Sequence, residues 1–211
     1  MFDIEYKGGN GVVITTKKLT ALIDPKLSVL GLKDMNVANG VEIATEERFA
    51  SGDKAAQIQI EGPGEYEVGD FSIRGISAQR HLDDDTVEKK STMYRIEIGE
   101  VRIALIGNIA PKMTEDQLES LGVIDILIIP IGGNGYTLDA TSASALSRQI
   151  DPKVIIPVHY ADSALKYEVP QDTLETFTKE LGAPVEATGK LKVKGVATLP
   201  QTLTVIELTR S

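Results

Sequence analysis

The chain contains no cysteine and no tryptophan, and histidine occurs only twice, at His81 and His159. The absence of cysteine excludes thiol catalysis, cysteine-ligated zinc and disulfides, and it suits a reducing compartment. Long apolar runs are also missing. No stretch approaches the ~20 apolar residues of a membrane span, and the N-terminus has no apolar signal-peptide region. We therefore expect a soluble cytoplasmic protein that does not enter a membrane.

Positive charge is scarce in this chain. It has 22 Lys and Arg residues against 31 Asp and Glu residues, a formal net charge of −9. A protein that wraps nucleic acid needs a basic face, so we expect no nucleic-acid partner. The acidic run at residues 83–85 is interpreted as a solvated loop, because adjacent carboxylates repel one another unless a cation gathers them.

The first half of the chain has the pattern of short β-strands. Apolar runs are separated by turn sequences at residues 8–11, 62–64, 69–70 and 99–100, which are rich in glycine. With 211 residues, of which 42% are hydrophobic, the chain is long enough to build one core. These features predict antiparallel β-meanders in the first half.

Strands and helices alternate after Asn108. Residues 112–122 carry Thr114 and Gln117 at capping-box spacing and predict a short helix. Apolar strands are predicted at 125–133 and 153–160, and further helices follow each of them, the last with Asp172 as N-cap. No linker or repeat divides the chain, so we predict a single domain over residues 1–211, with two sheets face to face and helices outside.

Six segments, in this order along the chain, resemble the metallo-β-lactamase fold and in particular its bacterial branch of lactonase-like and phosphodiesterase-like hydrolases. They read GNGVVI, LIDP, GPGEYEV, IALIGN, IDILIIPIGG-GYTLDA and PKVIIPVHY, and they lie within residues 8–160. The resemblance implies an α/β (α+β) fold, a four-layer αββα sandwich. It also implies a metal site at one edge, built from loops at strand ends.

The main metal motif of this family has the form Thr-His-x-His-x-Asp-His. Two of its histidines serve one zinc ion, and the Asp-His pair serves a second. The corresponding stretch here is TEERFAS, residues 45–51, in which every ligand position has changed. The residues at those vestigial positions are Glu46, Arg48, Ala50 and Ser51.

The remaining ligand positions match His81 (a slip of one residue stays open), Asn108 in place of a bridging aspartate, and His159 as an intact match. The cationic Arg48 opposes a metal ion, and the neutral amide of Asn108 lacks the charge that offsets two dications. The sequence therefore predicts no metal cofactor. The alternative is one weakly bound zinc or manganese ion held by His159, His81, Asn108 and Glu46.

Three residues keep two interpretations each. His159 either caps its strand without chemistry or acts as a general base, with Asn108 or Asp24 as its orienting partner, so His159 and Asn108 are the candidate catalytic residues. The Arg48 guanidinium either occupies the space of the metal ions, paired with Glu46 or another carboxylate, or is a solvated loop residue. His81 is either a solvated residue or a pocket-lining base.

The glycine-rich turn IGGNGYTLDA is either a tight connection or a set of backbone N–H groups presented to an anion. In the family that the chain resembles, this loop borders the pocket, which makes a small anionic ligand the expected partner. The residues expected to line the pocket are Asp24, Glu46, Arg48, His81, Gly132, Gly133, Tyr136 and Tyr160.

The altered metal motif leads to a functional prediction. We expect a non-catalytic binding, regulatory or scaffold member of the fold. One alternative is a diverged hydrolase of lactones or phosphoesters that works without zinc or with a single weak metal. Another is a structural subunit that forms a homo-oligomer or pairs with an active relative, since fold alone does not fix function.

Overall fold

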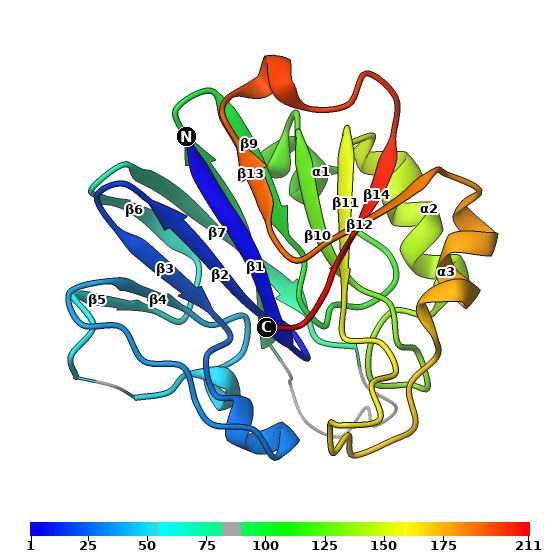
Figure 1. The fold of residues 1–211 in the computed structure, drawn as a ribbon, viewed down its shortest axis with the longest axis horizontal. Coiled ribbons are helices and arrows are strands. Elements are labelled where there is room, and N and C mark those ends of the chain that lie inside the picture. Colours follow the sequence, from blue (N-terminus) through cyan, green and yellow to red (C-terminus); the bar gives the residue numbers. More distant parts are fainter. Residues whose placement is uncertain (53, 82–89) are drawn as a thin grey trace.

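The computed structural model describes residues 1–52, 54–81 and 90–211, so the acidic run at residues 83–85 lies outside the described residues. Two β-sheets pack face to face and form a sandwich (Figure 1). The sandwich predicted from the sequence is thereby confirmed.

One sheet has six strands in the order β13-β1-β2-β3-β4-β5. Its members are β1 (Phe2–Gly8), β2 (Gly11–Thr16), β3 (Thr20–Ile23), β4 (Val41–Ile43), β5 (Ile58–Ile60) and β13 (Leu191–Val193). Side chains of a strand point alternately to its two faces, and in β1 Phe2, Ile4 and Tyr6 are buried between the sheets. This sheet therefore contributes one apolar face to the core.

The other sheet has eight strands in the order β12-β14-β11-β10-β9-β8-β7-β6. Its members are β6 (Gly64–Val68), β7 (Phe71–Gln79), β8 (Lys90–Ile98), β9 (Val101–Leu105), β10 (Ile126–Pro130), β11 (Val154–Val158), β12 (Val185–Thr188) and β14 (Thr204–Leu208). Strands β10 and β11 pair in parallel and are buried at every residue. Strands buried on both faces read as continuous apolar runs, which is why the sequence predicted them.

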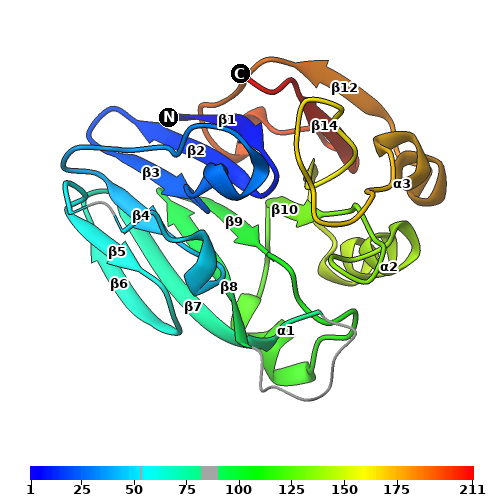
Figure 2. The same ribbon diagram turned by 90° about the horizontal axis from the view of Figure 1, so that it is seen from below.

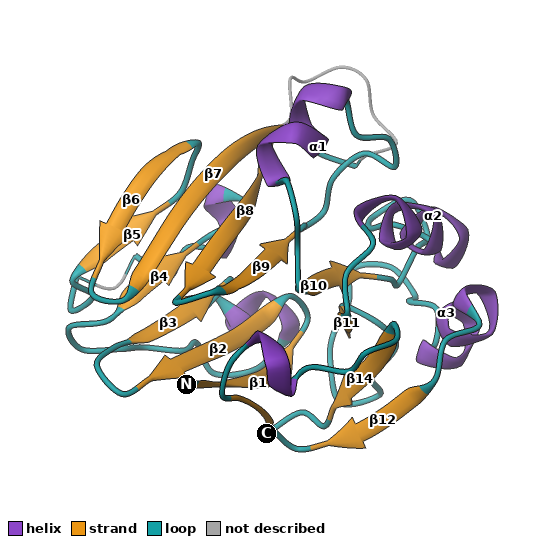
Figure 3. Ribbon diagram, turned by 90° about the horizontal axis from the view of Figure 1, so that it is seen from above, coloured by secondary structure: helices purple, strands orange, loops and turns teal. Residues whose placement is uncertain are grey.

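Three α-helices are found in the described residues, α1 (Glu115–Leu121), α2 (Ala140–Ile150) and α3 (Leu174–Leu181). They lie against the outer face of the eight-stranded sheet and close a second apolar core there (Figure 3). The capping box of Thr114 and Gln117 is confirmed. The prediction of Asp172 as an N-cap is wrong, because α3 begins after Thr173. No helix in the described ranges is long and apolar enough to span a membrane.

One end of the sandwich gathers the loops that follow several strands, and we call it the pole. It comprises residues 9–10, 24–30, 44–51, 80–81, 106–109, 131–137 and 159–172, and Figure 2 views the molecule from this side. Strands β9, β10 and β11 run parallel, so their carboxyl ends meet at the same edge of the sheet. Loops at the carboxyl ends of parallel strands are where α/β sheets place binding residues.

Two loops of the pole approach each other very closely at Gly132. The carbonyl oxygen of Gly132 accepts a hydrogen bond from the backbone N–H of Asp172 at 2.7 Å. A Cβ atom at this position would lie 2.3 Å from the backbone oxygen of His159 and 2.1 Å from Gln171 Oε1. Only glycine fits there, so residue 132 sets how closely the loop after β10 packs on the loop after β11.

We predict that Gly132→Ala lowers the free energy of unfolding by about 1–3 kcal/mol, the usual cost of overpacking a tight contact. Gly189→Ala is the matched control, because a Cβ there would have no heavy atom within 4 Å. The control should stay within about 0.5 kcal/mol of the wild type in urea denaturation. Equal stability of the two variants would contradict the close approach at Gly132.

Candidate functional site

Glu46 is the centre of a polar cluster at the pole. Its side chain is only 4% exposed, and its Oε2 atom pairs with Arg48 Nε at 2.9 Å and with Arg80 Nε at 2.8 Å. Its Oε1 atom accepts a hydrogen bond from Asn108 Nδ2 at 2.9 Å. Asn108 Oδ1 in turn accepts from Asn10 Nδ2 at 3.2 Å. Both oxygens of the Glu46 carboxylate are therefore engaged by protein donors.

Asp24 holds the start of the segment that carries this cluster. It follows β3 with a left-handed φ of 46°. Its two carboxylate oxygens accept hydrogen bonds from the backbone N–H and the hydroxyl of Thr45, both at 2.7 Å. Burial raises the pKa of Asp24 to about 7, and the two hydrogen bonds from Thr45 oppose this rise. Asp24 thus positions Glu46 and Arg48 from behind.

His159 follows β11 in a left-handed conformation, with φ of 52°, and its backbone N–H donates to the Gly9 carbonyl at 2.8 Å. Its Nδ1 atom lies 3.0 Å from Gln171 Oε1. Gln171 Nε2 donates to the Val169 carbonyl at 2.9 Å, which orients the amide so that Oε1 faces the imidazole. We therefore assign the proton of the neutral ring to Nδ1, which leaves Nε2 as an acceptor.

Burial lowers the pKa of His159 to about 4, the hydrogen bond to Gln171 acts in the opposite direction, and the charge of Arg48 adds to the lowering. A buried imidazole that loses its solvation favours the neutral form. His159 is therefore neutral at pH 7, with an unprotonated Nε2. Such a nitrogen is able to bind a metal ion, to accept a hydrogen bond or to take up a proton.

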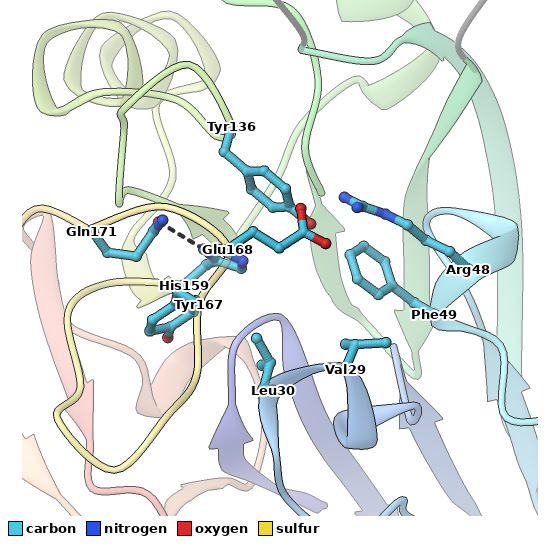
Figure 4. A pocket seen from close by; sticks show the side chains of 9 residues that line it. All are labelled: Val29, Leu30, Arg48, Phe49, Tyr136, His159, Tyr167, Glu168 and Gln171. Atoms are coloured by element: carbon cyan, nitrogen blue, oxygen red, sulfur yellow. Dashed lines mark hydrogen bonds between the residues drawn. The ribbon is translucent and has the colours of Figure 1, made fainter.

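A pocket with a cavity volume of about 50 Å³ lies between Arg48 and His159 (Figure 4). The Arg48 guanidinium carbon lies 4.5 Å from the ring centroid of Phe49 and 4.8 Å from that of Tyr136. The His159 ring stacks on Tyr136 at 5.3 Å and meets Tyr167 at 4.9 Å. Aromatic contacts thus hold both polar ends of the pocket in place. The lining residues are Val29, Leu30, Arg48, Phe49, Tyr136, His159, Tyr167, Glu168 and Gln171.

Six of the candidate residues named from the sequence meet at the pole, in the Glu46 cluster, behind it or in the adjoining pocket. They are Asp24, Glu46, Arg48, Asn108, Tyr136 and His159. The orienting partner of the imidazole is Gln171, where the sequence suggested Asn108 or Asp24. Asn108 serves Glu46 instead, and Asp24 serves Thr45.

Ser51 and His81, two of the vestigial positions, make contacts outside the Glu46 carboxylate. The backbone N–H and the hydroxyl of Ser51 both donate to the Glu42 carboxylate, and Ala50 has no ligating atom. His81 contributes its backbone N–H to the Asn108 carbonyl at 2.9 Å. The side chain that reaches Glu46 from this strand end belongs to Arg80, one residue earlier.

Six of the eight candidate pocket residues lie outside the pocket lining, namely Asp24, Glu46 and His81, described above, and Gly132, Gly133 and Tyr160. Gly133 donates its N–H to the Leu138 carbonyl at 3.0 Å, so the glycine-rich turn uses this donor for its own connection. Gly132 contacts the 171–172 segment. The ring of Tyr160 stacks on Tyr6 at 5.8 Å, against the core. The glycine-rich turn therefore acts as a tight connection in the described structure.

The sequence did not identify several residues of the site, namely Asn10, Phe49, Arg80, Tyr167, Glu168 and Gln171. Shifting the alignment at His81 by one residue would have found Arg80. Tyr167, Glu168 and Gln171 lie on the loop between β11 and α3, where no periodic pattern marks which side chain faces the pole. Only the fold brings that loop to His159.

The donor set at the pole does not fit the dinuclear zinc centre that the resemblance implies. Within the described ranges there is no group of three or more His, Cys, Asp or Glu side chains that could hold a metal ion. Zinc sites use three or four nitrogen, oxygen or sulfur ligands. Of the seven vestigial positions, only His159 offers an imidazole to the pocket, and the carboxylate of Glu46 already contacts two guanidinium groups.

Comparison with known proteins gives a match to a family model and similarity to two relatives. The family model of the β-lactamase superfamily domain matches residues 3–159. A UPF0173 protein of Pyrococcus furiosus is 29% identical over 125 residues, 58% of this chain and 51% of that protein. A UPF0173 metal-dependent hydrolase of Natranaerobius thermophilus is 39% identical over 64 residues, 30% of this chain and 27% of that protein. The chain thus spans about half the length of the first relative and less of the second.

A solved structure shares the whole fold. It is a candidate Zn-dependent hydrolase of the metallo-β-lactamase superfamily from Thermotoga maritima, with a TM-score of 0.79 and 22% identity. The similarity covers 99% of this chain and 100% of that one. The metallo-β-lactamase type of sandwich expected from the sequence is thereby confirmed, with the α-helices of the described residues on the outer face of the eight-stranded sheet.

We predict that His159 makes stability depend on pH between its ordinary pKa of 6.5 and its folded value of about 4. In this window the unfolded imidazole binds a proton and the folded one does not, so stability falls as the pH falls. Relative to His159→Gln, the wild type should lose about 3 kcal/mol between pH 7 and pH 4.

Urea denaturation of both proteins at several pH values measures this difference. In parallel, ¹⁵N spectra of the two histidine rings, assigned with His81→Gln, should show His159 neutral and protonated at Nδ1 at pH 6. A doubly protonated His159 ring at that pH would contradict the assignment of a neutral ring with its proton on Nδ1.

Proposed function

The chain belongs to the β-lactamase superfamily and is related to metal-dependent hydrolases, and we propose that it is a metal-free binding member of that superfamily. In this proposal the guanidinium groups of Arg48 and Arg80 take over the electrostatic role of metal ions at the pole. The pocket beside them then binds a small anionic ligand without turning it over.

The observation that carries the proposal is the pair of guanidinium groups on one buried carboxylate. Arg48 and Arg80 both lie within 3 Å of Glu46 Oε2, at 2.9 Å and 2.8 Å. Arginine stays charged at all physiological pH values, so both groups can neutralise Glu46 permanently. Arg48 Nε also donates a hydrogen bond to Glu46, whereas Arg80 Nε lies close without hydrogen-bond geometry and contributes its charge. A metal ion at the same place would meet two fixed positive charges, which disfavours its binding.

The charge balance supports an anionic ligand. Arg48 and Arg80 face Glu46, and Glu168 also lines the pocket, so these four charges cancel, whereas the whole chain carries −9. Arg48 lines the pocket directly, and the neighbouring His159 is neutral. A site without net charge that offers a guanidinium group is more favourable for a negatively charged molecule than the rest of an acidic surface.

The protein purified without chelator is predicted to contain less than about a tenth of an equivalent of zinc or manganese, because the described residues of the pole do not gather the three or four ligands that such sites need. Metal content is measured by mass spectrometry after incubation with excess metal and desalting. Stoichiometric metal in the wild type would refute the proposal.

A matched control restores the ligands of the family motif in the same fold. It carries Glu46→His, Arg48→His, Ala50→Asp, Ser51→His, Arg80→His and Asn108→Asp. This variant should retain zinc under the same conditions and should be stabilised by zinc against heating, since ligand binding to the folded state raises its stability.

A second candidate function rests on the unprotonated Nε2 of His159, which suits a general base in hydrolysis without metal. For a metal-free hydrolase, lactones and phosphodiesters would be cleaved by the wild type and at least about 100-fold more slowly by His159→Ala. A substrate panel with both proteins tests this candidate. Activity that His159→Ala leaves unchanged would exclude His159 as its base.

A further inference from the structure

Arg48 supplies the cationic group among the described residues that line the pocket. Arg48 Nε lies 2.9 Å from Glu46 Oε2, and Nη2 reaches Glu46 Oε1 only at 3.5 Å. Its side chain is 29% exposed, and the planes of Phe49 and Tyr136 hold it from two sides. A planar guanidinium held in this way presents its remaining N–H groups in a fixed fork, which matches the two oxygens of a carboxylate.

A carboxylate of the chain itself also lines this pocket. Figure 4 shows the Glu168 side chain reaching toward the same pocket as Tyr136 and Arg48. Glu168 belongs to the exposed loop between β11 and α3 and lines the pocket. Its charge also contributes, after burial, to the raised pKa of Tyr136, which is about 12, so the two groups are close. Glu168 thus brings a negative charge to the pocket, which opposes the binding of an anion.

The opposite end of the pocket offers an acceptor. Since Nδ1 of His159 faces Gln171, the other ring nitrogen points into the pocket toward Arg48 (Figure 4). A neutral imidazole nitrogen accepts a hydrogen bond from a hydroxyl group but repels no neighbouring anion. Between the two ends the lining is apolar, with Leu30 and Phe49 among it. A cavity of about 50 Å³ holds only a few water-sized groups, which limits the buried part of a ligand to a short carbon chain.

We propose that this pocket binds a small hydroxycarboxylate, with its carboxylate on the Arg48 fork and its hydroxyl donating to Nε2 of His159. Glu168 lines the same pocket, and its charge opposes the bound carboxylate. The inference rests on the proposed metal-free pole and adds the class of ligand. A free carboxylate needs the guanidinium fork, whereas a phosphate dianion would meet the Glu168 charge more strongly.

The test is a titration followed by the ring signals of His159, which are readily resolved because the chain has only two histidines. The probes are 3-hydroxybutanoate, butanoate, 3-hydroxybutanamide and inorganic phosphate. We expect saturable shifts with 3-hydroxybutanoate at a Kd on the order of 1 mM, as suits a ligand of this size. Butanoate should bind more weakly, since it lacks the hydroxyl, and the uncharged amide should not bind.

Variants test the Arg48 end of the pocket, where the carboxylate of the ligand is proposed to bind. Glu168→Gln removes a competing charge from an exposed loop and should tighten binding about 5-fold. Arg48→Gln should weaken it at least about 10-fold, because a charge-assisted pair is lost. Arg74→Gln and Glu65→Gln are matched controls on the exposed ion pair of β6 and β7, and should leave binding unchanged.

Three outcomes would overturn the inference. They are no saturable shift even in Glu168→Gln, tighter binding of phosphate than of the hydroxycarboxylate, and equal binding of the amide. Glu168→Gln alters only an exposed loop residue, so the binding measurements on this variant test the inference even if Arg48→Gln fails to fold. Metal retained by the wild type would refute the metal-free proposal itself. Failure of that proposal can therefore be told apart from failure of the ligand inference.

Discussion

The Glu46 carboxylate organises the pole of this protein. A carboxylate this buried would be costly to keep charged without partners, and here two guanidinium groups and one amide supply them. Removing one partner would leave an uncompensated charge, so Arg48, Arg80 and Asn108 depend on one another through Glu46. The geometry of the pocket follows from this, because the orientation of Arg48 is fixed by its bond to Glu46.

The fold brings the members of this cluster together from distant parts of the chain. Glu46 follows β4 of one sheet, Arg80 and Asn108 follow β7 and β9 of the other, and His159 follows β11. The left-handed backbone at Asp24 and His159 lies at the same end. Non-glycine residues in this conformation are uncommon, and they cluster where the surrounding structure holds a functional geometry. The sandwich thus keeps a built site at the pole even though the site's chemistry differs from that of a zinc centre.

The sequence predicted the elements whose stability is local or whose burial is complete. Helix α1 was predicted from its capping box, and β10 and β11 from their continuous apolar runs. Strand β12 was not predicted, because its residues are exposed throughout and it is held by backbone pairing with β14. Its pattern carries no hydrophobic period that could reveal it.

The same distinction applies to the site. Glu46, Arg48 and His159 stand at motif positions, so the sequence predicted that they lie together at one edge of the sandwich. Gln171 and Glu168 lie on a loop whose course depends on the close packing of Gly132 against His159, a contact far apart in sequence. The proton on Nδ1 of His159 and the carboxylate in the pocket therefore became accessible to inference only with the fold.

The most direct test of the central claim is a crystal structure grown with excess zinc, with anomalous data collected on both sides of the zinc absorption edge. The account predicts the guanidinium groups of Arg48 and Arg80 on Glu46 and no zinc peak at the pole. A zinc peak within about 2.1 Å of Nε2 of His159, the usual Zn–N distance, with Arg48 turned away from Glu46, would contradict it.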